Sequence, residues 1–173
     1  MVTKVLFLDR DGICNLPIIK NGKPFSPRYV NQLIFHPDIK CVVEAAKNKN
    51  YKIFIVTNQP DVARKSMTLN VANEINKLVL EHSGADDLFA CYHDDSDNCD
   101  CRKPKTGLFS AALQLHQITQ SESIMIGDRH SDMLAGSSFG CTTIFIDYKY
   151  SEPKVSFPDY RFDSLIETIA LIK

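Results

Sequence analysis

Two aspartates two positions apart, directly after a short apolar run, are the residues that most constrain the chemistry of this chain. Asp9 and Asp11 lie in Phe7-Leu-Asp-Arg-Asp-Gly12, which overlaps the run Val5-Leu-Phe-Leu8. At the end of a buried strand, both carboxylates can reach one phosphate group and one metal ion. Asp9 is then placed to attack phosphorus, and Asp11 to give and take a proton. Asp-x-Asp-Gly also occurs in plain turns, so other parts of the chain must show whether this segment is a catalytic motif or a turn.

Further polar residues supply what phosphoryl transfer requires besides a nucleophile. Asp128 adds a third carboxylate, and three such groups beside a phosphate repel one another unless a hard cation lies among them. Mg²⁺ suits this position because it prefers oxygen ligands. Thr57 can donate a hydrogen bond to a phosphoryl oxygen, and Lys103 can neutralise its charge. Alone, each would be an ordinary strand-end threonine or surface lysine, but together with the aspartates they favour a catalytic site.

Short apolar runs alternate with amphipathic segments along the whole chain, which we interpret as one domain over residues 1–173. This order predicts an α/β fold: a three-layer, Rossmann-like parallel sheet with helices on both faces. In such sheets ligands bind at the carboxyl ends of the strands, where Asp9, Thr57 and Asp128 would meet. The predicted strands are Lys4–Leu8, Lys52–Val56, Leu88–Tyr92, Ser123–Ile126 and Thr142–Ile146.

Apolar residues three and four positions apart predict the helices between these strands. A last helix is expected to run from a cap at Ser164 to Leu171. The segment between Asp11 and Ile53 holds a loop and one helix, which is too short for a large inserted cap. The predicted helix faces are Ile39, Val42, Val43 and Ala46; Val71, Ile75, Leu78 and Val79; and Leu108, Ala112 and Leu115. Met133, Leu134 and Phe139 are placed in a further short helix after Gly127.

Four soft or borderline metal ligands occur within eleven residues. Cys91-Tyr-His93 and Cys99-Asp-Cys101 can close a tetrahedron around one zinc ion. With no open coordination position, such a zinc ion would be structural. It would hold a polar loop that has no apolar contacts of its own, and would fix Arg102 and Lys103 behind it. Free thiols or an adventitious disulfide are the alternative.

Composition excludes several classes of protein. The 173 residues are 44% hydrophobic with a net charge of -1, so no basic excess favours a nucleic-acid partner. No apolar run approaches the roughly 18 residues of a membrane helix, and no signal-peptide core precedes the first strand. We therefore expect a cytoplasmic protein. A monomer is expected as well, because no helix has an apolar stripe that demands a partner.

Four motifs in order resemble the haloacid dehalogenase superfamily of phosphatases. They are Phe7-Leu-Asp-Arg-Asp-Gly12, Thr57-Asn-Gln59, Cys101-Arg-Lys-Pro104 and Gly127-Asp-Arg129. The closer resemblance is to small, nearly cap-less members, the D-glycero-D-manno-heptose 1,7-bisphosphate phosphatases and the histidinol-phosphatase domains. It covers the chain from Leu6 to about residue 147, and members of both groups carry a zinc loop.

The resemblance implies roles for individual residues. Asp9 would be the nucleophile and Asp11 the acid and base. Asp9, the backbone carbonyl of Asp11 and Asp128 would hold Mg²⁺, while Thr57 and Lys103 would steady the phosphoryl group.

The substrate is predicted from the residues expected around these groups. Arg102 and Arg129 suit a second anionic group, as in a sugar bisphosphate. A surface salt bridge is the alternative for Arg129. We expect the other substrate contacts to come from Asn15, Asn58 and Gln59.

The favoured substrate is heptose 1,7-bisphosphate, losing its 7-phosphate in a pathway that supplies heptose for lipopolysaccharide or another surface glycan. Histidinol phosphate is the alternative within the same enzyme class. Pro60, Asp61 and Lys65 depart from the heptose bisphosphatase loop and leave the exact substrate open. A non-catalytic phosphate-binding module is the alternative of another class, but such modules are expected to lose the nucleophile or the acid.

Overall fold

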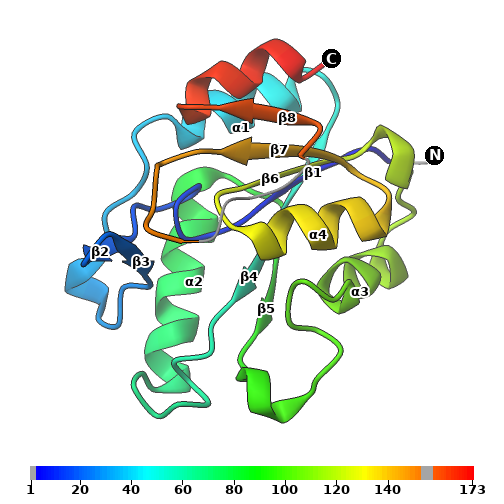
Figure 1. The fold of residues 1–173 in the computed structure, drawn as a ribbon. Helices are drawn as coiled ribbons and strands as arrows, with labels where there is room; N and C mark the ends of the chain where they lie inside the picture. Colours follow the sequence, from blue (N-terminus) through cyan, green and yellow to red (C-terminus); the bar gives the residue numbers. More distant parts are fainter. Residues whose placement is uncertain (1–2, 153–157) are drawn as a thin grey trace.

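A six-stranded parallel sheet forms the centre of the protein in the computed structural model, which describes residues 3–152 and 158–173 (Figure 1). The strand order is β5-β4-β1-β6-β7-β8, and every neighbouring pair is parallel. All five predicted strands are present, so the predicted fold class is confirmed. The sixth, β8, was not predicted because it is a three-residue edge strand.

The elements follow one another in this order: β1 Val5–Leu8, β2 Ile18–Lys20, β3 Lys23–Phe25, η1 Val30–Gln32, α1 Ile39–Lys47, β4 Lys52–Asn58, α2 Leu69–Ser83, β5 Asp87–Cys91, η2 Asp95–Asp97, α3 Gly107–Leu115, η3 Gln120–Glu122, β6 Ile124–Gly127, α4 His130–Phe139, β7 Thr142–Ile146, β8 Tyr160–Phe162 and η4 Leu165–Leu171. No helix within residues 3–152 and 158–173 is long and apolar enough to cross a membrane.

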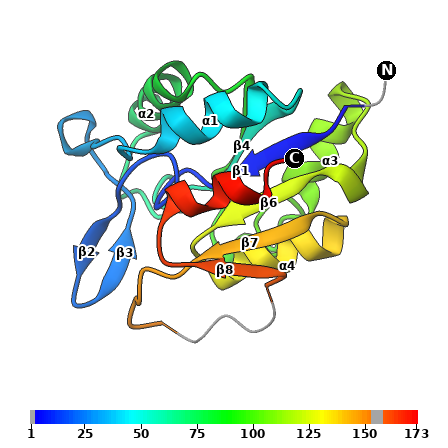
Figure 2. The same cartoon turned by 90° about the horizontal axis from the view of Figure 1, so that it is seen from above.

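Helices cover both faces of the sheet, which explains why the strands are apolar almost without interruption (Figure 2). Leu6 and Leu8 of β1 point into a core shared with α1, α2 and η4. Val5 and Phe7 point into a second core shared with α3 and α4. Alternate residues of one strand therefore serve two separate cores.

One predicted core position is wrong, and the predicted short helix after Gly127 also has one exposed leucine. Leu115 is 69% exposed, because it is the last residue of α3 and the chain leaves the helix there. Leu134 is 42% exposed, because α4 approaches the sheet through other residues. A side chain on Gly136 would place its Cβ 2.7 Å from the Cβ of Met125, so this glycine permits close helix–sheet contact. That contact turns Leu134 toward solvent.

The segment between Asp11 and α1 contains a β-hairpin where only a loop was expected. Strands β2 and β3 pair in antiparallel fashion and lie beyond the carboxyl edge of the main sheet (Figure 2). Their turn is Asn21-Gly22, with φ angles of 51° and 73°. Asn-Gly is the commonest dipeptide for a two-residue hairpin turn, so this signal was present in the sequence. The hairpin is the small cap of this protein.

The last helix follows its predicted cap but has a different geometry. Ser164 donates from both its backbone N–H and its hydroxyl to Glu167, at 3.0 and 2.9 Å. From there the chain forms the 3-10 helix η4, Leu165–Leu171, instead of an α-helix.

Replacing Phe7 with alanine tests the aromatic core beneath the active edge. Its ring lies 4.7 Å from that of Phe109, 5.8 Å from that of Phe139 and 6.0 Å from that of Phe54, between centroids. We expect Phe7→Ala to lower the free energy of unfolding by about 3–5 kcal/mol, measured by urea denaturation. Leu115→Ala is the matched control and should change it by less than about 0.5 kcal/mol. Equal losses in the two variants would contradict this packing.

Candidate active site

Three carboxylates converge at the carboxyl edge of the sheet. Asp9 follows β1, Asp128 follows β6, and Asp132 comes from the first turn of α4. One carboxylate oxygen of each lies within 4.8 Å of the others, and all three residues are buried. Asp132 was missed by the sequence analysis. Its signal was its position four residues after Asp128, one helical turn further along.

Gly12 permits this close approach. Its φ angle is 91°, and a Cβ at this position would lie 1.9 Å from Oδ2 of Asp128. Any larger residue would therefore displace the third carboxylate, which explains why a glycine must follow the two aspartates.

Lys103 places its ammonium group between two of these carboxylates. Its Nζ lies 2.8 Å from Oδ1 of Asp9 and 2.7 Å from Oδ1 of Asp132, and it also donates to the carbonyl of Val56 at 2.7 Å. Asn58 holds the backbone of Lys103 on both sides. It accepts from the lysine N–H at 3.0 Å and donates to its carbonyl at 2.9 Å. The predicted proximity of Asp9, Lys103 and Asn58 is therefore observed.

The charges of this cluster shift its proton equilibria. Burial and the carboxylate of Asp132, opposed by Lys103, raise the pKa of Asp9 to about 7. Burial and the neighbouring Asp9 raise the pKa of Asp128 well above its ordinary value. Burial alone would lower the pKa of Lys103, but Asp132 and Asp9 raise it, so the ammonium stays charged.

The donor set of this edge fits a hard divalent cation. Its oxygens are carboxylates, the ligand type that Mg²⁺ prefers, and Lys103 alone leaves two negative charges uncompensated. Within the described residues, Oδ1 of Asp128 is buried without a hydrogen-bond partner, while its Oδ2 accepts from the hydroxyl of Tyr150 at 3.0 Å. An orphaned carboxylate oxygen beside two further carboxylates is what a cation would pair with.

Asp11 is held by a ring of donors. Arg10 contacts both of its oxygens, at 3.0 and 3.1 Å, and Ser26 donates at 2.7 Å. The side-chain amides of Asn15 and Gln59 donate at 3.0 and 2.8 Å. Burial would raise the pKa of Asp11, but Arg10 and these donors hold it below its ordinary value.

The structure corrects the predicted substrate contacts of Asn15 and Gln59. Both are fully buried and lie off the wall of the cavity, where their amides orient Asp11. The sequence could not show this, because an amide beside a carboxylate and an amide beside a substrate look alike. Thr57 is also buried, and its hydroxyl accepts from Gln59 at 2.9 Å.

A cavity of about 390 Å³ opens over Asp9, Asp11, Lys103 and Asp128, and the hairpin contributes residues 23–26 to its wall. Asn58, Arg102 and Arg129 line it, as expected for substrate contacts. Each arginine already has a carboxylate partner. Arg102 Nε lies 2.7 Å from Asp95, and Arg129 Nη2 lies 2.7 Å from Glu152.

Arg64, from the loop after β4, also lines this cavity and pairs with Asp94. Lining of the pocket by the segment from Thr57 to Arg64 was expected from the sequence, whereas Lys23 of the hairpin was given no role. Only the folded chain places the charge of Lys23 over the same cavity as Asp9.

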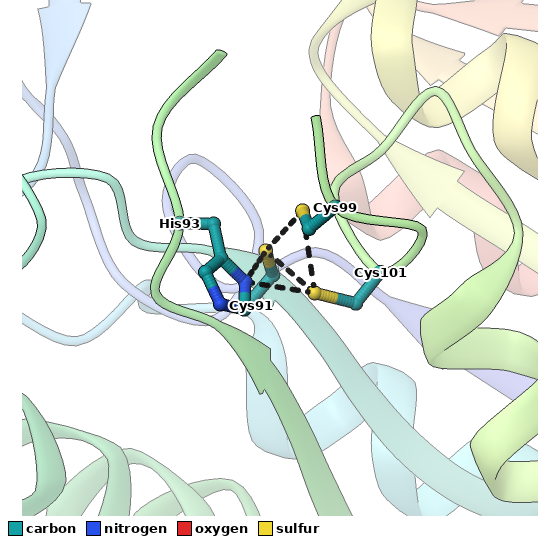
Figure 3. Close-up of side chains that lie close together, drawn as sticks. All are labelled: Cys91, His93, Cys99 and Cys101. Carbon is teal, nitrogen blue, oxygen red and sulfur yellow. Dashed lines mark hydrogen bonds between the residues drawn. The ribbon is translucent and has the colours of Figure 1, made fainter. Parts of the chain in front are cut away.

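The four predicted zinc ligands lie together at the end of β5 (Figure 3). Cys101 Sγ is 2.9 Å from Sγ of Cys91, 3.5 Å from that of Cys99 and 3.3 Å from Nδ1 of His93. Cys91 Sγ is 3.7 Å from Sγ of Cys99 and 3.6 Å from Nδ1 of His93. All six cysteines are free thiols, so the disulfide alternative is not observed. Three sulfurs and one imidazole nitrogen are a donor set suited to tetrahedral zinc.

Comparisons with known proteins show the family of this chain. The profile of the haloacid dehalogenase-like hydrolases matches residues 26–140. A D-glycero-beta-D-manno-heptose-1,7-bisphosphate 7-phosphatase of Helicobacter pylori is 38% identical over 142 residues, which are 77% of each chain. The histidine biosynthesis bifunctional protein of Campylobacter jejuni is 32% identical over 146 residues. These cover 81% of this chain but 40% of that protein.

A solved structure has the same fold. The D,D-heptose 1.7-bisphosphate phosphatase of B. bronchiseptica, crystallised with magnesium and phosphate, superimposes with a TM-score of 0.80 at 19% identity, over 98% of both chains. The sheet, the order of the motifs and the matched profile lead to one conclusion. This chain belongs to the haloacid dehalogenase-like hydrolase family.

Proposed function

We propose that this protein is a Mg²⁺-dependent phosphatase that removes the 7-phosphate of D-glycero-D-manno-heptose 1,7-bisphosphate through an aspartyl-phosphate. The observation that carries the proposal is the cavity floor, where Lys103 lies 2.8 Å from Asp9 and Asp11 lines the same cavity. Identity of 38% with a heptose bisphosphatase over 77% of the chain supports the substrate.

In the proposed reaction, a carboxylate oxygen of Asp9 attacks phosphorus and the bond to the sugar oxygen breaks. Asp11 gives its proton to that oxygen, so that the sugar leaves as an alcohol. Asp11 then takes a proton from water as the water attacks the phosphoryl group and frees Asp9. Lys103 and the hydroxyl of Thr57 balance the charge that develops on the phosphoryl oxygens.

Two metal ions have residues that fit them. Asp9, Asp128 and the backbone carbonyl of Asp11 would hold Mg²⁺, which supplies positive charge to the phosphoryl oxygens when bound. Cys91, His93, Cys99 and Cys101 would hold zinc in a closed structural site.

Arg102, Arg129 and Asn58 are the proposed contacts for the rest of the substrate. A bisphosphate needs more than one cationic contact. Arg102 reaches the cavity from the Cys/His loop, and Arg129 reaches it from the residue before α4. The hairpin has strands of only three residues each, and the cavity beside it has a volume of about 390 Å³. Histidinol phosphate, which has one phosphate, would use fewer of these cations.

The substrate is tested by phosphate release from the α and β anomers of heptose 1,7-bisphosphate, from histidinol phosphate and from fructose 1,6-bisphosphate. We expect the highest kcat/KM with one heptose anomer, and loss of that activity in EDTA because the carboxylate cluster needs a cation. Restoration by added Mg²⁺ is the control for EDTA. A higher kcat/KM with histidinol phosphate would contradict the proposed substrate.

Asp9→Asn tests the nucleophile. The amide has the same shape but does not attack phosphorus, so kcat should fall by more than about 10³-fold. Circular dichroism should show an unchanged fold. Asp163→Asn, at an exposed carboxylate outside the cavity, is the matched control and should retain wild-type kcat. A tenth of wild-type activity in Asp9→Asn would rule out Asp9 as nucleophile.

Cys99→Ser tests the zinc site. We expect bound zinc, measured by mass spectrometry, to fall from about one ion per chain to nearly none, and the melting temperature to fall with it. Cys41→Ser replaces an exposed thiol of α1 and should change neither quantity. Unaltered zinc content in Cys99→Ser would refute the site.

A further inference from the structure

Arg10, between the two aspartates of the first motif, has its side chain buried completely in the protein. Its Nη2 contacts both oxygens of Asp11, and its Nη1 donates to Oδ1 of Asn76 at 2.7 Å. A guanidinium group is costly to bury unless its N–H groups are paired. Asn76 and Asp11 therefore hold Arg10 from two sides.

Asn76 is an exception on its helix. It is 6% exposed on the face of α2 that also buries Ala72, Ile75 and Val79. A polar residue in an apolar stripe needs partners for both ends of its amide. Its oxygen accepts from Arg10, and its nitrogen donates to the hydroxyl of Tyr92 at 3.1 Å.

The direction of each hydrogen bond from Arg10 through Asn76 to Tyr92 is determined. Arg10 can only donate, so the oxygen of Asn76 must face it and the nitrogen must face Tyr92. The hydroxyl oxygen of Tyr92 must then accept, and its hydrogen goes to Oδ1 of Asn73, 2.6 Å away. Tyr92 itself lies between Cys91 and His93, at the end of β5. The chain thus runs from the Cys/His cluster through α2 to Asp11.

We propose that Asn76, held by Tyr92, is a positioning residue that orients the proton donor Asp11 through Arg10. The inference rests on the proposed function, in which Asp11 protonates the leaving oxygen. If Asn76 is truncated, Nη1 of Arg10 loses its buried acceptor and the guanidinium moves, and Asp11 moves with it. A displacement of about 1 Å in a catalytic group can cost about 10²-fold in rate.

Comparing substrates with different leaving groups distinguishes a loss of proton donation by Asp11 from a general loss of stability. A sugar alkoxide needs a proton in order to leave, whereas the phenolate of p-nitrophenyl phosphate leaves without one. We expect Asn76→Ala to lower kcat/KM for heptose 1,7-bisphosphate by about 10- to 100-fold, and that for p-nitrophenyl phosphate by less than about threefold. Asp11→Asn should likewise lose more kcat/KM with heptose 1,7-bisphosphate than with p-nitrophenyl phosphate, and its loss should be larger than that of Asn76→Ala.

Three variants complete the experiment. Asn76→Asp keeps an acceptor for Arg10 and should restore most of the sugar phosphatase activity. Tyr92→Phe removes one hydroxyl and should lower kcat/KM for heptose 1,7-bisphosphate by about three- to tenfold, and that for p-nitrophenyl phosphate by less. This variant tests the inference even if Asn76→Ala does not fold. Asn70→Ala, on the exposed face of α2, is the matched control and should leave kcat/KM unchanged for both substrates.

Equal losses on both substrates in Asn76→Ala and Tyr92→Phe would overturn the inference, as would wild-type rates in both. In either case Asp11→Asn would still discriminate between the substrates, and the proposed function would stand. Equal losses on both substrates in Asp11→Asn would instead remove the proposed proton donor, and the inference would fail with it.

Discussion

The ammonium group of Lys103, buried between Asp9 and Asp132, is the interaction on which the geometry of the active edge depends. It holds carboxylates from β1 and α4 together that would otherwise repel each other. Its own position is determined by Asn58 of β4 and by the carbonyl of Val56. The ammonium group of Lys103 therefore contacts residues of three separate elements of the fold, and a displacement of any of these elements would also displace Asp9.

A second set of interactions holds Asp11. Its carboxylate accepts from four side chains, which come from the first loop, the hairpin and the end of β4. Asp9 is thus held by one charged partner in a crowded, negative environment, while Asp11 is held by several donors in a positive one. Opposite environments push the pKa values of the two aspartates in opposite directions, that of Asp9 up and that of Asp11 down. The proposed roles need the reverse: a bound cation beside Asp9 would lower its pKa, and a phosphate dianion beside Asp11 would raise that of Asp11.

Local patterns in the sequence predicted the sheet and most of the residues that the structure brings together at its carboxyl edge. Buried parallel strands are continuous apolar runs, and the functional residues stand directly after them. Asp132 and the hairpin were missed although the sequence carries a weak signal for each. The role of Asp132 depends on how α4 docks, and the strands of the hairpin have only three residues each. Asn15 and Gln59 were predicted to face substrate, and only packing shows that they face Asp11. Leu115 was misplaced because the apolar spacing does not show that the chain leaves α3 at this residue.

The arginines around the cavity have a consequence for selectivity. Arg64, Arg102 and Arg129 each pair with a resident carboxylate, so an incoming anion must compete with a group that already neutralises them. A singly charged metabolite gains little from such an exchange, whereas a phosphate dianion brings more charge than the carboxylate it replaces. The entrance would thus work as a charge threshold, admitting ligands by how much negative charge they carry in addition to how well they fit.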